Sequence, residues 1–133
     1  MSGIHAALAT AESSTVLVVA CDLPFVTTEL LAGIIALLEY GTDAVVPRVS
    51  GRAVPVCALY RRACLERLQA CLDRGELIAQ QFVASLATTY VDDDVLERIN
   101  FHGSHRSHRI CLKNINTPED FEQAEEIAAE ELK

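Results

Sequence analysis

The residue best placed for chemistry is Asp22. It follows Thr15–Ala20, a run of β-branched and apolar residues typical of a strand buried on both faces, as in a parallel sheet. Ligands of open α/β sheets bind beyond the carboxyl ends of the strands, and Mg²⁺ favours one or two protein oxygens together with substrate phosphates. The position therefore suits a magnesium ligand, and the alternative is a cap of the turn that Pro24 fixes.

A second polar pair, Asn114 and Asn116, stands just before the last expected helix. Residues two apart in a strand point to the same side, so both amides would face one site. There they could complete a metal shell or bind a substrate hydroxyl. The alternative is a strand-to-helix turn in which the asparagines make local hydrogen bonds.

Three histidines at three-residue spacing, His102, His105 and His108, are the third candidate. No carboxylate or thiol close in the sequence fixes a metal geometry for them, so a solvated loop is the favoured interpretation. With Arg106 and Arg109 they form the densest cationic patch of the chain, which could still attract an anionic substrate.

The cysteines and one acidic run have simpler interpretations. Five cysteines, an odd number, suit a reducing compartment: Cys21, Cys57, Cys64, Cys71 and Cys111. On one helix, Cys64 and Cys71 would lie about 10 Å apart along its axis, too far to share a zinc ion. We interpret the series Cys57, Cys64, Cys71 as small buried hydrophobes, and the run 92–94 as part of a solvated loop.

The elements that must position these residues alternate between helices and strands. Helices are expected near 4–11, 27–38, 61–72, 76–86 and 117–132, and strands near 15–20, 43–47, 54–60, 87–91 and 110–115. Pro55 argues that its strand is an edge or contains a bulge. Thr27 or Thr28 can cap the second helix, the segment 48–52 is expected to be a polar turn, and Gly75 is expected to end the third helix. Thr117 is the expected N-cap of the last helix, whose inward stripe would begin at Phe121. This alternation predicts an α/β layered fold.

Composition limits the classes of protein. A chain of 133 residues with 50% hydrophobic residues supports one domain with a packed core. The net charge of −8 disfavours binding to nucleic acid, which needs a basic face. No stretch is long and apolar enough to span a bilayer, and Met1 is not followed by a secretory leader, so we expect a cytoplasmic protein without a membrane partner.

Four segments are similar, in the same order and spacing, to those of one family. Ser2–Leu8 is similar to the end of that family's Gly-Pro-Leu-x-Gly loop and the following helix, and Val16–Pro24 to its buried strand and Cys-Asp-x-Pro turn. Pro55–Arg61 is similar to its Gln-Pro-Leu-x-Ala-Leu-Tyr segment, and Asn114–Asp120 to its Asn-Ile-Asn-Thr-Pro-Glu-Asp signature. The chain therefore resembles the molybdenum-cofactor guanylyltransferases, which are relatives of the sugar-phosphate nucleotidyltransferases.

The resemblance implies a Rossmann-like, GT-A-like three-layer fold that transfers GMP from GTP to molybdopterin and requires Mg²⁺. Asp22 would be the Mg²⁺ ligand, Asn114 and Asn116 would be active-site amides near the metal or the pterin, and Gly3 would belong to the loop against the nucleotide. The molybdopterin phosphate would attack the α-phosphorus of GTP in line, with pyrophosphate leaving. Positioning and electrostatics would supply the catalysis.

The chain also departs from the family pattern. The first strand and the Gly-rich loop that grips the nucleotide have no counterpart, so residues 1–133 are expected to form a single partial domain. Leu77 and Ile78 stand where the family tends to place a basic residue. We expect strand 15–20 to form an open sheet edge that promotes self-association, and the chain alone to lack GTP binding and activity.

Two alternatives remain open at this stage. The first is a cytidylyltransferase that acts on the same cofactor. The second is a non-catalytic module that binds molybdopterin or a partner protein.

Overall fold

The centre of the molecule is a mixed β-sheet. The computed structural model describes residues 2–23, 25–76, 78–100, 112 and 117–131. Its strands are β1 (Thr15–Val19), β2 (Ala44–Val49), β3 (Arg52–Ala53), β4 (Cys57–Arg61) and β5 (Thr88–Val91). They follow the order β1–β4–β2–β3, with β5 also paired to β2. The pairing is antiparallel except between β2 and β5, which run parallel.

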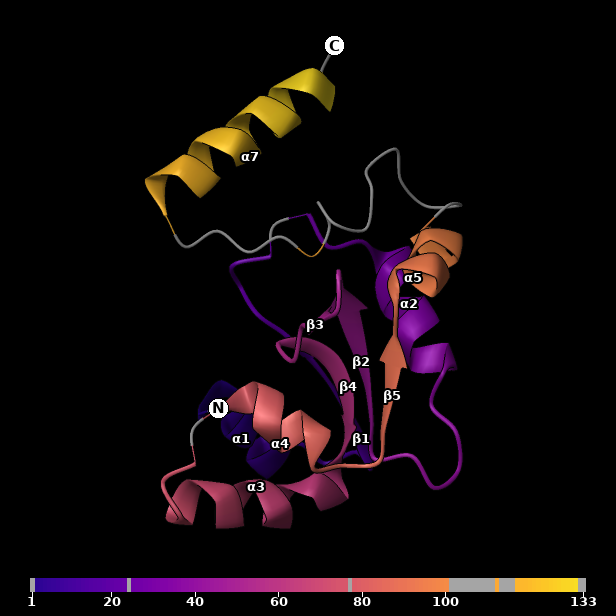
Figure 1. Cartoon of the computed structure of the whole chain (residues 1–133), viewed down its shortest axis with the longest axis vertical. Helices are drawn as coiled ribbons and strands as arrows, with labels where there is room; N and C mark the ends of the chain where they lie inside the picture. Colours follow the sequence, from indigo (N-terminus) through magenta and orange to yellow (C-terminus); the bar gives the residue numbers. More distant parts are fainter. Residues whose placement is uncertain (1, 24, 77, 101–111, 113–116, 132–133) are drawn as a thin grey trace.

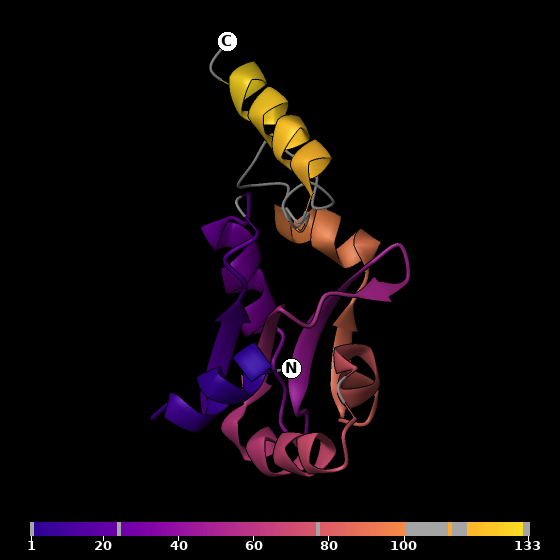
Figure 2. The same ribbon diagram turned by 90° about the vertical axis from the view of Figure 1, so that its left-hand side faces the viewer.

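Helices cover both faces of this sheet (Figures 1 and 2). They are α1 (Ser2–Thr10), α2 (Thr28–Ala36), α3 (Leu65–Asp73) with a preceding 3₁₀ turn η1 (Arg62–Cys64), α4 (Ala79–Ala84) and α5 (Asp93–Asn100). A further helix, α7 (Pro118–Glu131), extends away from the sheet in both views. One core cluster joins α1, α3 and α4 to the sheet, and a second joins α2 and α5 to it. The predicted α/β layered fold is confirmed.

Strand alternation explains the two cores. Ala44 and Val46 of β2 lie in the cluster with α1, α3 and α4, whereas Val45 lies in the cluster with α2 and α5. All three side chains are fully buried. A strand covered on both faces needs apolar residues at consecutive positions, and this requirement explains the unbroken apolar run in β2.

Local signals in the sequence predicted several helix ends correctly. The Thr27 side chain accepts a hydrogen bond from the Leu30 amide at 3.2 Å and so caps α2. Thr117 and Asp120 form a reciprocal pair, with distances of 3.1 and 3.2 Å between side-chain oxygens and amides. This capping box satisfies two amides that the start of α7 would otherwise leave unpaired. Gly75, with a φ of 75°, follows the end of α3 as expected.

Other predictions were wrong because they depended on distant parts of the chain. The first strand, β1, is antiparallel to β4 and mostly half-buried, not a doubly buried parallel strand. Pro55 lies before β4, which is a central strand between β1 and β2. Phe121 is 55% exposed, so the expected inward stripe of α7 does not begin there. The expected strand 110–115 lies outside the described residues except for Leu112.

The turn between β2 and β3 is shorter than the predicted turn over residues 48–52. Arg48 and Val49 belong to β2 and Arg52 to β3, so the turn is reduced to Ser50 and Gly51, whose φ angles are 51° and 81°. Two successive positive φ angles are typical of a tight hairpin turn.

Among the helices in the described part of the chain, none has the length and apolar content that crossing a bilayer requires.

The position of β1 leads to a prediction about self-association. Within the described residues β1 pairs only with β4, and Val19 at its end is 39% exposed. We expect the chain to associate as its concentration rises, because an unpaired apolar edge can pair with another chain. Val19→Lys should shift sedimentation velocity profiles toward monomer. Ile35→Lys, at a 48% exposed position on α2, is the matched control; an equal shift in both variants would show that the edge is not responsible.

The contact between α2 and α5 leads to a second prediction. A Cβ atom added to Gly33 would lie 2.3 Å from Cγ2 of Ile99, an atom too close to the α5 backbone to move away freely. Overpacking should destabilise Gly33→Ala by about 1–3 kcal/mol, reduced by about 1 kcal/mol because alanine favours the helix. Urea unfolding should detect the loss, and Ile99→Ala in the same chain should remove the clash.

Gly3→Ala provides the control for this substitution. Gly3 also lies in a helix, but an added Cβ there would meet no atom within 4 Å. This variant should be as stable as the wild type or more so. Equal effects at Gly3 and Gly33 would contradict the packing argument.

Candidate functional site

The site begins at Asp22, just beyond the carboxyl end of β1. The Ala20 amide donates to the Val56 carbonyl at 2.8 Å, which continues the β1–β4 pairing to within two residues of Asp22. Oδ1 of Asp22 is buried and has no hydrogen-bond partner among the described residues. An unpaired buried carboxylate oxygen is costly, so this oxygen is suited to binding a cation.

The carboxylate of Asp22 is a ligand of the kind that Mg²⁺ prefers. Within the described residues, no group of three histidine, cysteine, aspartate or glutamate side chains could hold a metal ion. Mg²⁺ commonly binds through one or two carboxylates and takes its other ligands from water and substrate phosphates. Asp22 can supply such a carboxylate.

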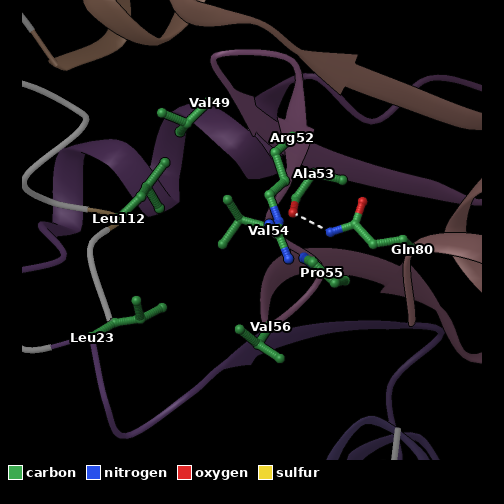
Figure 3. Close-up of a pocket in the computed structure, with 9 residues that line it drawn as sticks. All are labelled: Leu23, Val49, Arg52, Ala53, Val54, Pro55, Val56, Gln80 and Leu112. Carbon is green, nitrogen blue, oxygen red and sulfur yellow. Dashed lines mark hydrogen bonds between the residues drawn. The ribbon is translucent and has the colours of Figure 1, made fainter. Parts of the chain in front are cut away.

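A pocket of about 300 Å³ opens next to this segment (Figure 3). Most of its walls are apolar, with one cation and one amide among them: Leu23, Val49, Arg52, Ala53, Val54, Pro55, Val56, Gln80 and Leu112. Nε2 of Gln80 donates to the Ala53 carbonyl at 2.6 Å, which ties α4 to the end of β3. An apolar pocket with a few polar groups is the usual form of a small-molecule site.

The hairpin that forms one wall of the pocket is held by charged groups. Arg48 donates two hydrogen bonds to the carboxylate of Asp92, at 2.6 and 2.9 Å. Its guanidinium also lies 4.3 Å from the centroid of the Tyr90 ring, a cation–π contact. The Ser50 amide donates to Asp93 at 3.0 Å. These contacts fix the hairpin to the junction of β5 and α5.

The same contacts correct the interpretation of the run 92–94 as part of a solvated loop. Asp92 pairs with Arg48, and its pKa is lowered because the carboxylate accepts hydrogen bonds from the guanidinium. The same hydrogen bonds raise the pKa of Arg48. Asp93 and Asp94 start helix α5, where negative charge near the N-terminus is favourable.

A buried hydrogen bond supports the opposite wall of the pocket. The hydroxyl of Tyr60, on β4, donates to the Pro55 carbonyl at 2.5 Å, and the side chain is fully buried. Burial raises the pKa of Tyr60, so the phenol remains a hydrogen-bond donor. The carbonyl of a residue that lines the pocket is therefore held in place from within the core.

The cysteines have the predicted structural role where the structure describes them. Cys57, Cys64 and Cys71 are buried in the two cores. Burial raises the pKa of Cys57 to about 12, so its thiol stays protonated at neutral pH. Cys21 is exposed next to Asp22, and Cys111 lies outside the described residues.

The remaining candidates differ in how the structure places them. Gly3 lies in the first turn of α1 and not in a loop, which corrects the predicted local structure at this position. The two asparagines Asn114 and Asn116 lie outside the described residues, as do the histidines at 102, 105 and 108. Leu112, which is described, lines the pocket.

Sequence reasoning missed Arg52 and Gln80 as residues of this site. Neither belongs to a recognisable motif, and the pocket forms only when the hairpin, β4 and α4 come together. One signal was available, because Ser50-Gly51 between apolar and basic residues is a typical two-residue turn. A hairpin there would have placed Arg52 opposite Val49.

The chain is similar to known proteins over most of its length. The family model of the MobA-like NTP transferase domain matches residues 1–89. The molybdenum cofactor guanylyltransferase of Desulfosudis oleivorans is 31% identical over 123 residues, which cover 92% of this chain and 58% of the relative. That of Vibrio campbellii is 33% identical over 123 residues, covering 92% and 57%.

A solved structure extends the similarity to the fold. Molybdopterin-guanine dinucleotide biosynthesis protein A from Archaeoglobus fulgidus matches with a TM-score of 0.81 and 28% identity, over 97% of this chain and 62% of that one. The chain thus spans between 57% and 62% of the length of these three proteins. On the family match and the relatives together, the chain belongs to the MobA-like NTP transferase domain family.

Proposed function

We propose that this chain is the metal- and pterin-side part of a molybdenum-cofactor guanylyltransferase, which transfers GMP from GTP to molybdopterin. The observation that carries the proposal is Oδ1 of Asp22 at the end of β1, which is buried and has no hydrogen-bond partner among the described residues, beside a largely apolar pocket. In this proposal residues 1–133 are one part of a nucleotidyltransferase domain, and the Gly-rich segment that grips the nucleotide belongs to another part. The names of the relatives support guanine over cytosine as the base.

Asp22, with Asn116 as a further candidate, would hold Mg²⁺. When bound, Mg²⁺ offsets the negative charge of the phosphates during transfer. The Asp22 segment is fixed by the backbone pairing of β1 with β4, so its carboxylate needs little rearrangement to act. Positioning is therefore the main contribution of this part of the chain.

No protein nucleophile is required for the reaction. An oxygen of the acceptor's phosphate would form a bond to the α-phosphorus of GTP, while the bond from that phosphorus to the bridging oxygen breaks and pyrophosphate leaves. The apolar walls of the pocket would hold the pterin and exclude water from it. Asn114 and Asn116 would orient the acceptor through amide hydrogen bonds, and Gly3 would lie near the nucleotide.

Replacement of Asp22 tests the metal assignment. Asp22→Asn keeps the shape of the side chain but removes its charge, so the affinity of the chain for Mn²⁺, used as a spectroscopic substitute for Mg²⁺, should fall by at least about tenfold. Electron paramagnetic resonance titration measures this affinity on the 133-residue chain. In a chain joined to the uncovered part of the Desulfosudis oleivorans relative, the variant should nearly abolish guanylyl transfer.

Asp94→Asn is the matched control, because Asp94 is an exposed carboxylate whose neighbour is Arg98. This variant should bind Mn²⁺ as the wild type does. Unchanged Mn²⁺ affinity in Asp22→Asn, or an equal loss in both variants, would refute the assignment of Asp22 as the metal ligand.

Replacement of Asn116 distinguishes a role in ligand binding from a structural role in the turn. If the amide binds metal or pterin, Asn116→Ala should weaken ligand binding and leave the melting temperature almost unchanged. A residue that makes only a local capping-type hydrogen bond should instead lose about 1 kcal/mol of stability. Thermal unfolding and ligand titration on the same sample distinguish these results, and a loss confined to stability would contradict the proposed role.

A further inference from the structure

We propose that Arg52 is the residue that binds the phosphate group of the acceptor, whose flat ring occupies the pocket beside it. The inference rests on the proposed function and names the acceptor's contact within that site. The ligand class is a phosphate monoester attached to a planar heterocycle. Nothing in the sequence motifs assigned a role to Arg52, so the argument depends on its surroundings.

The first observation is that the Arg52 side chain has no hydrogen-bond or ion-pair partner among the described residues. Five other arginines donate to carboxylates or backbone carbonyls: Arg48, Arg61, Arg67, Arg74 and Arg98. Within the described part of the chain, only Arg52 and Arg62 have no side-chain hydrogen bond or ion pair. In a protein with a net charge of −8, most described guanidinium groups are already engaged. Arg52 is available to an anionic ligand.

The second observation is where this free cation lies. Arg52 lines the pocket, and in Figure 3 its side chain extends from β3 beside Val54 toward Pro55. Arg62 does not line this pocket. A guanidinium presents parallel N–H groups that match two phosphate oxygens. The apolar walls around it suit the ring of the same ligand, whereas inorganic phosphate would leave them uncovered.

The third observation is that Arg52 stands on a fixed element. In the hairpin register, Arg52 lies opposite Val49, and the adjacent pair is Arg48 with Ala53. Both residues of this adjacent pair are held by other parts of the protein. Arg48 is held by Asp92, and the Ala53 carbonyl by Gln80. Both ends of the short hairpin are therefore restrained. A free side chain on a fixed backbone can select a ligand at a small entropic cost.

Fluorescence titration with two pterins tests the proposal on the 133-residue chain. The probes are 6-hydroxymethylpterin phosphate and unphosphorylated 6-hydroxymethylpterin, both measured in EDTA so that bound metal plays no part. The wild type should bind the phosphorylated probe about tenfold more tightly, because a charge-assisted pair is made only with that probe. Arg52→Gln should remove this preference through a loss of affinity for the phosphorylated probe.

Two further variants make the result specific to Arg52. Arg52→Lys keeps the positive charge but lacks the planar guanidinium group with its two parallel N–H donors. This variant should retain part of the preference that Arg52→Gln loses. Arg62→Gln replaces the second arginine that has no partner among the described residues. Arg62 does not line the pocket, so this variant should behave as the wild type. Circular dichroism of each variant verifies that the fold is retained.

Several results would overturn the inference. These are a wild type that does not bind the phosphorylated probe saturably, a wild type that binds both probes equally, and an equal loss in Arg52→Gln and Arg62→Gln. The Mn²⁺ titration of Asp22 is independent of all three. With Mn²⁺ binding intact, equal binding of the two probes or an equal loss in the two variants rejects the role of Arg52 alone. A wild type that does not bind the phosphorylated probe also rejects the pterin pocket, and loss of the Mn²⁺ site with the phosphate preference intact rejects the metal assignment.

Discussion

The pairing of β1 with β4 is the constraint on which the rest of the structure depends. Its register runs from Thr15 opposite Arg61 to Val19 opposite Cys57, and the bond from Ala20 to Val56 continues it. Because of this pairing, the chain that leaves β1 reaches Asp22 and Leu23 where the segment before β4 forms a pocket wall. A shift of one residue would turn the Asp22 segment and the buried residues of β4 to the wrong faces. The candidate metal ligand and the pocket are thus two results of one backbone pairing.

The sequence predicted those parts of the fold that depend on neighbouring residues. The Thr117 cap, the Gly75 terminus and the strands at 15–20 and 87–91 each follow from a few consecutive residues. The neighbour of β1 could not be predicted in this way, because it depends on a strand some forty positions later in the chain. An apolar β-branched run indicates a strand, but it does not state which partner the strand has or in which direction that partner runs.

The residues of the candidate site also differ in whether neighbouring or distant parts of the chain determine their position. Asp22 could be proposed from the sequence because the end of an apolar strand is a local signal and strand ends are where ligands bind in α/β sheets. Arg52 and Gln80 could not, since each is an ordinary polar residue until the hairpin and α4 meet. Asp92 was misinterpreted for a related reason, because Arg48, its partner, is 44 positions away. Pairs of charges distant in sequence leave no periodic pattern.

We propose above that Asp22 holds the divalent cation beside the pterin pocket. Anomalous X-ray diffraction from crystals of the chain grown with Mn²⁺ and 6-hydroxymethylpterin phosphate tests it most directly, since it locates the metal without reliance on a variant. The account predicts an anomalous peak about 2.0–2.2 Å from a carboxylate oxygen of Asp22. A fully occupied Mn²⁺ site elsewhere in the protein, with none at Asp22, would contradict it.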